Sequence, residues 1–437
     1  MPETPDPPPL PEPRRIPPTV RAFLQTETAG AVVLLAGALI ALVWANSPWK
    51  DAYESLWSTR LSVGLGDASV SEDLRHWVNE GLMALFFLVV GLEIKRELVA
   101  GELRAWRTAA LPALAALGGM VVPAVLYTAV NLGQEGAGGW GIPMATDIAF
   151  ALGVLALLGS RINPSLRLFL LTLAIVDDIG AIVVIAAFYS DGIRWLPLGA
   201  AALLLVAVGL LPRTRIYWLP AYATLALGAW VLVFASGVHA TIAGALLGLL
   251  APARPAAPAQ VVHRWSEALS EEPAESDRAR MSELASSAKS VTERLQQALH
   301  PLTSFVIVPV FALANAGVTF ERDALSARGA TAVAGGVVLG LVMGKILGIG
   351  GFSFLAVRLK LGSLPADVRW SELVGVGALA GVGFTVSLFI ADLAFTGPLL
   401  KAAKTGILGA SLLASVVGVG WLWAVSRRPD RSSDRQE

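Results

Sequence analysis

The sequence contains no cysteine and few charged residues. Of its 437 residues, 15% are charged and 55% are hydrophobic, whereas a soluble domain averages roughly 25% charged and 45–50% apolar. The lack of cysteine excludes disulfides, thiolate metal ligands and cysteine nucleophiles. Lysine plus arginine and aspartate plus glutamate both number 33, so the formal net charge is zero and implies no attraction to nucleic acid. These figures exclude a disordered chain and argue against a single water-soluble globule.

Long apolar runs account for the low charge content. A helix needs roughly 20 apolar residues to cross ~30 Å of hydrocarbon, and the runs in this chain predict about twelve such helices. The fold class expected is therefore an all-α polytopic membrane protein. The predicted spans are 27–47, 79–99, 107–131, 141–159, 166–188, 195–212, 217–235, 237–252, 299–318, 329–357, 371–396 and 400–424.

Successive predicted loops lie on alternate sides of the membrane, and lysine and arginine are more frequent in the loops of one side than of the other. Because such residues are enriched on the cytoplasmic side of membrane proteins, the bias predicts that both termini are cytoplasmic. The inside segments carry Arg14, Arg15, Arg21, Lys95, Arg96, Arg104, Arg107, Arg161, Arg167, Arg213, Arg215, Arg358, Lys360, Arg427, Arg428 and Arg431. The outside loops carry Lys50, Arg60, Arg75, Arg194, Arg322, Arg328, Lys401 and Lys404.

Composition divides the chain into five segments. Proline-dense or polar ends predict disordered cytoplasmic tails at 1–20 and 426–437. Residues 21–252 would hold spans one to eight and residues 299–425 spans nine to twelve. Residues 253–298 predict a cytoplasmic loop with an amphipathic helix toward its end; a solvated linker with no role is the alternative.

Ionisable residues inside the predicted spans mark the candidate site, since each costs at least ~2.5–3.5 kcal/mol to insert. They are Asp147, the adjacent Asp177 and Asp178, Lys345, and His239 near the start of the eighth span. Two neighbouring carboxylates in a low dielectric repel each other, and Lys345 would relieve that conflict. A static ion pair locking two helices is the alternative. Three aspartates against one lysine leave excess negative charge that a cation or proton must neutralise.

Two of the predicted spans contain helix breakers. Gly139, Gly141 and Pro143 precede Thr146 and Asp147 in the fourth span, and residues 375–387 of the eleventh are rich in glycine. This pattern indicates crossing, discontinuous helices whose exposed carbonyl oxygens suit a hard cation. Asp147 would offset the positive half-helix ends and Lys345 the negative ones. Close helix packing is the alternative for the glycines, and it applies to Gly336, Gly340, Gly344 and Gly348.

A second group of polar residues is less specific. Glu93, Lys95, Arg96 and Glu97 lie at the cytoplasmic end of the second span. Anchoring at the interface explains the two basic residues, whereas the glutamates suggest a funnel for cations or a regulatory cluster. His239 either senses protons or simply donates to a backbone carbonyl.

Taken together, these segments resemble the NhaA family of sodium/proton antiporters over about residues 20–425. The segments that carry the resemblance are Phe86–Leu98, Ala145–Phe150, Ala174–Gly180, Ser236–Thr241, Pro309–Val318, Gly344–Lys345 and Gly381–Ser387. The resemblance implies twelve spans, with the third to fifth and the tenth to twelfth forming inverted repeats. It also implies a bacterial inner membrane, electrogenic export of Na⁺ or Li⁺ against protons by alternating access, and no cofactor.

The same resemblance implies a role for each candidate residue. Asp177 and Asp178 would bind protons and, transiently, Na⁺, with Thr146 and Asp147 at the helix crossing. Lys345 would pair with Asp177 and help to carry the proton. Residues implied in pH regulation are Glu93, Arg96, Glu97 and His239. The long 253–298 loop and Gln296-Gln297, where the family's regulatory region commonly carries an acidic residue, depart from the pattern.

Two other functions compete with antiport. A Na⁺-coupled symporter for an organic anion would want more asparagine, glutamine and serine inside the spans. An intramembrane aspartyl protease needs its two aspartates on separate, facing helices, whereas Asp177 and Asp178 are consecutive. Neither alternative fits as well as a transporter that is not an enzyme. The polar stretch Ser58–Asp73 further suggests a hairpin that pairs two copies into a homodimer.

Overall fold

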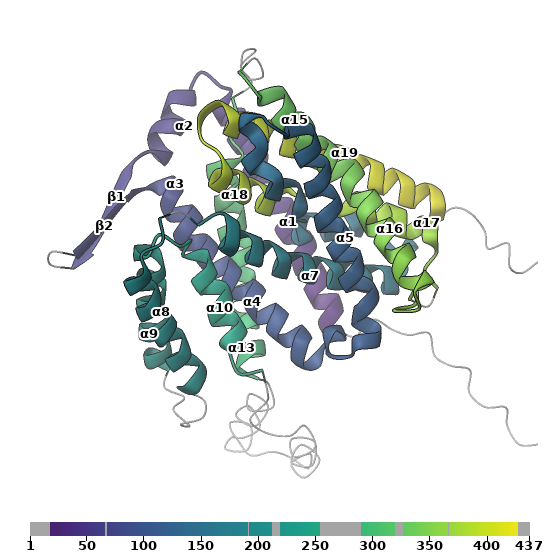
Figure 1. Cartoon of the computed structure of the whole chain (residues 1–437), viewed down its shortest axis with the longest axis horizontal. Helices are drawn as coiled ribbons and strands as arrows, with labels where there is room; N and C mark the ends of the chain where they lie inside the picture. Colours follow the sequence, from purple (N-terminus) through teal and green to yellow (C-terminus); the bar gives the residue numbers. More distant parts are fainter. Residues whose placement is uncertain are drawn as a thin grey trace, which may run out of the picture.

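The computed structural model describes residues 18–65, 68–190, 192–211, 219–253, 290–319, 327–365 and 367–426. In these residues the chain is a bundle of helices with one small β-hairpin at its edge (Figure 1). The expected all-α polytopic fold is confirmed. The predicted tails and the 253–298 loop lie mostly outside the described residues.

All twelve predicted spans correspond to helices. Six are long, continuous and apolar, two are bent pairs, and three are shorter apolar helices. The remaining span combines a π-helical turn, η1 (Trp77–Leu82), with α4 (Met83–Ala100). The six long spans are α1 (Pro18–Ala45), α5 (Trp106–Asn131), α7 (Pro164–Phe188), α13–η6–α14 (Val291–Leu302, Thr303–Ile307, Val308–Asn315), α15–η7–α16 (Ala330–Leu339, Gly340–Gly344, Lys345–Arg358) and α19 (Gly397–Ser426). The three shorter ones are α8 (Trp195–Leu210), α9 (Leu219–Ala235) and α10 (Thr241–Leu250).

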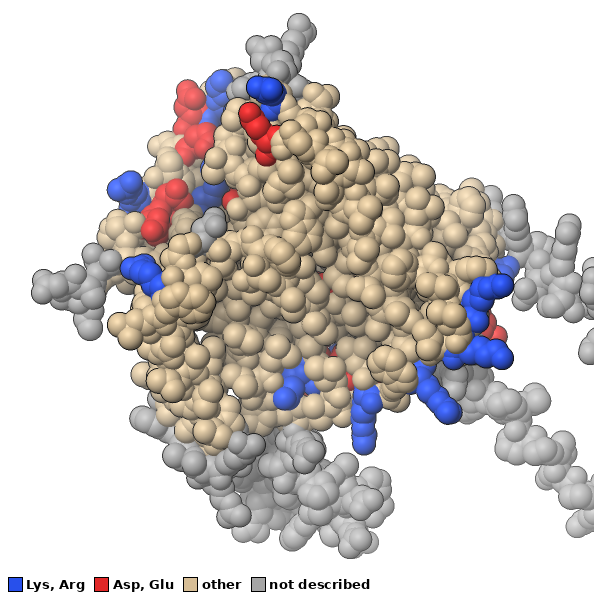
Figure 2. Space-filling model, in the orientation of Figure 1, with Lys and Arg blue, Asp and Glu red and all other residues tan. Residues whose placement is uncertain are grey.

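The surface has the charge distribution of a membrane protein. Figure 2 shows charged side chains at two opposite ends and a broad uncharged band between them. Within that band large apolar side chains point outward, for example Leu203, which is 72% exposed. We call the end that carries Arg104 and Arg107 the basic face and the opposite end the hairpin face.

The hairpin face carries the extramembrane structure. Strands β1 (Arg60–Leu65) and β2 (Ala68–Asp73) pair antiparallel, preceded by α2 (Lys50–Trp57) and followed by α3 (Leu74–His76). The hairpin predicted at Ser58–Asp73 is therefore present. Burial raises the pKa of Tyr53 to about 12, so its hydroxyl stays protonated and donates to the carbonyls of Leu313 and Ala314 at 2.9 and 3.0 Å. This contact fastens α2 to the end of α14.

The ninth span begins earlier than predicted. The expected amphipathic helix at the end of the 253–298 segment is α13, but it runs through η6 into α14 instead of ending in a loop. A capping box starts it: Ser290 Oγ accepts from the Glu293 amide and the Glu293 carboxylate accepts from the Ser290 amide. The continuous helix therefore starts eight residues before the predicted span boundary at residue 299, because it includes the predicted amphipathic helix.

Two groups of three spans share one layout, a long helix, a bent pair and a second long helix. In the first group α5 is followed by the pair η3 (Glu135–Met144) and α6 (Ile148–Ala156), bent by 49°, and then by α7. In the second, α15–η7–α16 is followed by α17 (Trp370–Leu379) and α18 (Phe384–Ala394), bent by 48°, and then by α19. The two predicted discontinuous spans are confirmed. We call these six spans the paired units and the other six the flanking spans.

The paired units pack on each other through glycine. A Cβ at Gly348 would lie 2.1 Å from the Gly118 carbonyl oxygen, and one at Gly344 would lie 2.8 Å from Pro123. Because real Cβ atoms do not approach so closely, the backbones of α5 and η7–α16 can meet at these positions only because the side chains are absent there. The close-packing role expected for these glycines is confirmed, and it places Lys345 beside the first bent pair.

Candidate functional site

The two bent spans cross where their helices are interrupted. The break in the first lies at residues 145–147 and that in the second at residues 380–383. The Asp147 amide donates to the Val382 carbonyl at 2.7 Å, and Thr146 Oγ1 donates to the Ala380 carbonyl at 2.9 Å. The first break therefore supplies the donors and the second break the acceptors. Unwound backbone inside a membrane requires such partners, because no water is present to replace them.

Asp147 lies between two helix N-termini. Its Oδ1 accepts from the Phe150 amide at 2.9 Å and caps α6. Its Oδ2 accepts from the hydroxyl and the amide of Thr385 at 2.6 and 3.1 Å, at the start of α18. Since helix N-termini carry partial positive charge, this buried carboxylate has the place predicted for it. Thr385 was missed as a site residue, although it stands where a half-helix was expected to begin.

Lys345 is the first residue of α16, and its side chain lies against the end of η3. It is fully buried, and its Nζ donates to Asp177 Oδ2 at 2.7 Å, to Thr146 Oγ1 at 2.9 Å and to the Met144 carbonyl. The three bonds use all three ammonium protons. The predicted pairing of Lys345 with Asp177 is confirmed, as is its position against a carbonyl at the end of a half-helix.

Asp177 and Asp178 face different surroundings, as expected for residues about 100° apart on a helix. Asp177 is 1% exposed; its Oδ2 accepts from Lys345, and its Oδ1 has no hydrogen-bond partner among the described residues. Asp178 is 6% exposed and lines a cavity. One carboxylate is thus held by an ammonium group, and its neighbour is open to a small solute.

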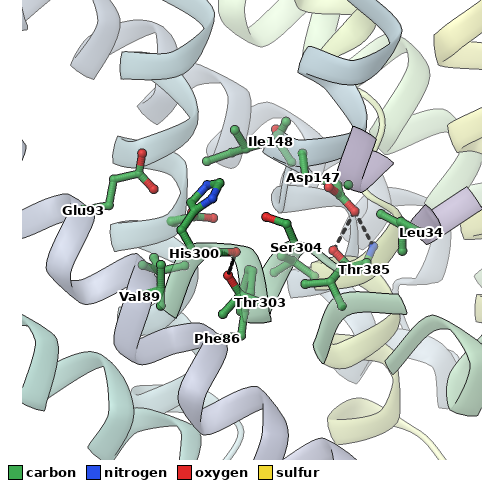
Figure 3. Close-up of a pocket in the computed structure, with 17 residues that line it drawn as sticks. Leu34, Phe86, Val89, Glu93, Asp147, Ile148, His300, Thr303, Ser304 and Thr385 are labelled. Carbon is green, nitrogen blue, oxygen red and sulfur yellow. Dashed lines mark hydrogen bonds between the residues drawn. The ribbon is translucent and has the colours of Figure 1, made fainter. Parts of the chain in front are cut away.

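The cavity extends from the crossing toward the basic face. Its volume is about 70 Å³, enough for a few water molecules, since one needs roughly 10–15 Å³. The polar residues that line it include Asp178, Asp147, Thr385, Glu93 and His300. Figure 3 shows Glu93 and His300 at one side of the cavity and Asp147 with Thr385 at the other. Carboxylate and hydroxyl oxygens of this kind suit a hard, small cation.

Comparisons with known proteins identify the family. A family model described as Na+/H+ antiporter 1 matches residues 21–422. The chain belongs to the NhaA family of Na⁺/H⁺ antiporters. It is 48% identical over 420 residues to "Na(+)/H(+) antiporter NhaA 3" of Frankia alni, covering 95% of this chain and 90% of that protein. It is 47% identical to "Na(+)/H(+) antiporter NhaA" of Syntrophobacter fumaroxidans (92% and 89% covered) and 45% identical to that of Rhodopirellula baltica (94% and 94%).

The four residues for which the NhaA resemblance implied pH regulation do not form one cluster. Glu93 lines the cavity, and one turn further Glu97 accepts from Arg96 at 3.2 Å and from the Glu102 amide at 3.1 Å. His239 contacts Glu80, which precedes Glu93 by 13 residues on the same span, or about 20 Å of helix. The group is therefore divided between the two faces.

Three ionisable residues of this NhaA chain were missed. Glu80 is 5% exposed and bonds to His239. Lys404 and Asp392 form an ion pair of 2.8 Å with side chains 10% and 11% exposed. Counting Lys404 among the outside-loop residues was wrong, because α19 begins at Gly397 and places Lys404 two turns inside the span. Glu80 and Asp392 both fall within predicted spans, so the rule that an ionisable residue inside a span marks a candidate site would have found them.

Proposed function

We propose that this chain exchanges Na⁺ or Li⁺ for protons across the membrane, exporting the cation from the cytoplasm. The observation that carries the proposal is the contrast between the two adjacent carboxylates. Asp178 lines a cavity that a small cation can enter, whereas Asp177 is bound by Lys345. The three relatives described above, each named as a Na⁺/H⁺ antiporter, support the same function.

Competition for one site couples the two ions. A cation that enters past Glu93 loses water and gains the carboxylate oxygens of Asp178 and Asp177. A proton that binds these carboxylates removes the charge that attracted the cation. Because an unneutralised pair of carboxylates is costly to move through the membrane, only the cation-loaded or the protonated site reorients. Lys345 compensates Asp177 while that carboxylate is ionised and releases it for the cation.

The crossing provides fixed charges for this exchange. The Asp147 carboxylate accepts hydrogen bonds from the N-termini of α6 and α18. It therefore holds the two bent spans together and adds negative potential at the inner end of the cavity. Thr146 bridges Lys345 and the second break. A shift of either bent span therefore changes the surroundings of Lys345 and Asp177 together.

The proposal includes placement in the cell. The basic face is cytoplasmic by the excess of arginine and lysine, so both termini are cytoplasmic and the cavity opens inward. The membrane is the bacterial inner membrane, the exchange is electrogenic and regulated by pH, no cofactor takes part, and the β1–β2 hairpin pairs two copies of the chain.

Reconstituted transport tests this function. Purified protein in liposomes with an acid interior should dissipate the pH gradient, followed by a quenched dye, when Na⁺ or Li⁺ is added outside. Addition of K⁺ should have no effect. The control is Asp178→Asn in the same liposomes, which should behave like protein-free vesicles. Equal responses to K⁺ and Na⁺, or normal Na⁺-driven dequenching with Asp178→Asn, would refute the assignment.

A further inference from the structure

The segment η3 of the first bent span has an unusual conformation for its length. All ten of its residues, Glu135–Met144, form a 3₁₀-helix. Such helices are uncommon beyond about three or four residues, because their hydrogen bonds are poorly aligned. The sequence adds little stiffness, since it contains four glycines and Pro143, which has no amide proton to donate. Contacts from outside the segment must therefore help to hold this conformation.

Two tyrosine hydroxyls bond to the backbone of η3 from different helices. Tyr127 of α5 donates to the Gly136 carbonyl at 2.8 Å. Tyr189, the residue after α7, donates to the Gly138 carbonyl and accepts from the Gly141 amide, both at 3.0 Å. Tyr127 is 0% and Tyr189 8% exposed, so solvent water is a poor substitute for either hydroxyl.

The glycines of η3 allow these two rings to come so close. A Cβ at Gly139 would lie 2.5 Å from the Tyr127 hydroxyl oxygen, and one at Gly141 would lie 2.7 Å from that of Tyr189. Because real Cβ atoms do not make such contacts, any other residue at either position would displace a ring or the segment itself. The sequence of η3 is therefore matched to the two hydroxyls that bond to it.

The other end of η3 belongs to the candidate site. Its last residue is Met144, whose carbonyl accepts from Lys345 Nζ, and the Ile142 carbonyl accepts from Ser387 Oγ of the second bent span at 2.8 Å. A 3₁₀-helix rises about 2.0 Å per residue and an α-helix about 1.5 Å, so a change to α-helix would shorten a ten-residue segment by about 5 Å. A change of that size would remove the Met144 carbonyl from Lys345.

We propose that Tyr127 and Tyr189 are positioning residues of the transport site. Their hydroxyls hold η3 in its extended conformation, which keeps the Met144 carbonyl in contact with Lys345. This role rests on the proposed function, in which Lys345 releases Asp177 when a cation binds. The carbonyl shares the ammonium group with Asp177. When that acceptor is lost, the ammonium bonds more strongly to the carboxylate, and a cation competes less well for it.

A third buried tyrosine provides the matched control. Tyr53 is 1% exposed, and its hydroxyl donates to the carbonyls of Leu313 and Ala314 at 2.9 and 3.0 Å. These bonds are of the same kind as those of Tyr127 and Tyr189, but they lie between α2 and α14, outside the paired units. Loss of the Tyr53 hydroxyl should therefore affect stability without reaching the transport site.

Amide hydrogen exchange tests whether the hydroxyls hold η3. The variants Tyr127→Phe and Tyr189→Phe keep each ring and remove only its hydroxyl, so both should fold. In purified protein without Na⁺, peptides that cover residues 135–144 should exchange about two- to tenfold faster in each variant, the factor for one lost neutral hydrogen bond. Tyr53→Phe should leave these peptides unchanged. Parent-like exchange in both variants would overturn the proposal, because other contacts would then hold η3.

Transport kinetics test whether the position of η3 affects the site. In liposomes, Tyr127→Phe and Tyr189→Phe should raise the apparent KM for Na⁺ by about two- to tenfold and keep the maximal rate per folded molecule close to that of the parent. Tyr53→Phe should keep both values. A loss that is only structural would lower the amount of folded protein and leave KM unchanged, because the molecules that remain folded would have an intact site.

The two measurements separate this inference from the proposed function. A parent chain that shows no Na⁺-driven exchange would refute the proposed function, whatever the amide hydrogen exchange shows. A parent that transports Na⁺ while Tyr127→Phe and Tyr189→Phe keep its KM would refute only the positioning role. An equal rise of KM in Tyr53→Phe would also refute that role, since the effect would then follow from the loss of any buried tyrosine hydroxyl.

Discussion

The paired units contain two Asp–Lys ion pairs that differ in their surroundings. Asp177–Lys345 and Asp392–Lys404 have nearly equal N–O distances of 2.7 and 2.8 Å, and both are largely buried. Lys345, however, donates to three acceptors, two from the first bent span and one from α7, and a second carboxylate, Asp178, lies next to its partner. Lys404 only joins α18 to the helix that follows it.

This difference distinguishes a transport site from a structural brace. A buried pair stabilises little by itself, because desolvation offsets the attraction, yet removing one partner is costly. Both pairs should therefore matter for folding. The first lies beside the cavity that Asp178 lines and beside an additional charge that must be neutralised, so the first should govern transport. The contrast can be tested one partner at a time.

The largest difference is expected between Asp178→Asn and Asp392→Asn. Neutralising Asp178 removes the charge that faces the cavity and should reduce Na⁺-driven exchange by about 100-fold or more, since about 2.8 kcal/mol of lost binding is already a factor of about 100. Asp392→Asn should keep exchange per folded molecule. Dye dequenching in liposomes, normalised to folded protein, measures both. Comparable losses in the two variants would remove the distinction between site and brace.

Lys404 should affect stability instead of transport. Lys404→Met leaves Asp392 buried and unpaired, which should lower the free energy of unfolding by about 3–5 kcal/mol. Thermal unfolding in detergent reports the loss. The exchanged pair Asp392→Lys with Lys404→Asp should recover much of it, because the opposite charges again face each other. A swap that unfolds as readily as Lys404→Met would show that packing around the lysine stem, and not the pair, is what α18 requires.

Much of the fold could be predicted because membrane insertion imposes strong rules. Long apolar runs predicted all twelve spans, and the glycine and proline residues before Thr146 predicted the first interruption. The amphipathic helix α13 was predicted, but its continuation into the ninth span was not, because hydropathy does not register the Ser290 capping box that starts this helix. Lys404 was placed outside the membrane because its partner, Asp392, lies on another helix and sequence spacing does not reveal such pairings.

The charged residues of the site could be predicted, because a charged residue inside an apolar span is easily recognised in the sequence. Asp147, Asp177 and Lys345 were found in this way, and the structure brings them to one crossing. The pairing of Lys345 with Asp177 came from the NhaA resemblance and not from the residues themselves, because which aspartate meets the lysine depends on how two units cross. Glu80 was missed for a related reason: near the end of a span a glutamate resembles an interface residue until His239, 159 positions away, is placed against it.

Thr385 should have an intermediate effect. Thr385→Val removes the hydroxyl that donates to Asp147 at 2.6 Å and leaves the backbone bond at 3.1 Å. A hydrogen bond to a charged group contributes about 1.5–3 kcal/mol, so the apparent KM for Na⁺ should rise about tenfold. Thr405→Val, which loses a bond to the exposed Lys401 carbonyl, is the matched control. An unchanged KM in Thr385→Val would mean that the backbone alone holds Asp147 in place.

The smallest effect is expected for a third ion pair, Arg75–Glu54 at the hairpin face. Its atoms are 3.2 Å apart, but the side chains are 32% and 56% exposed, and exposed pairs contribute about 0–1 kcal/mol. Glu54→Gln should therefore shift thermal unfolding very little, and less still in high salt, where exposed charges are screened. If its effect approached that of Lys404→Met, burial would not explain the cost of breaking a pair in this chain. The contrast drawn for Lys345 and Lys404 depends on that explanation, so the three variants should be measured in the same detergent and salt.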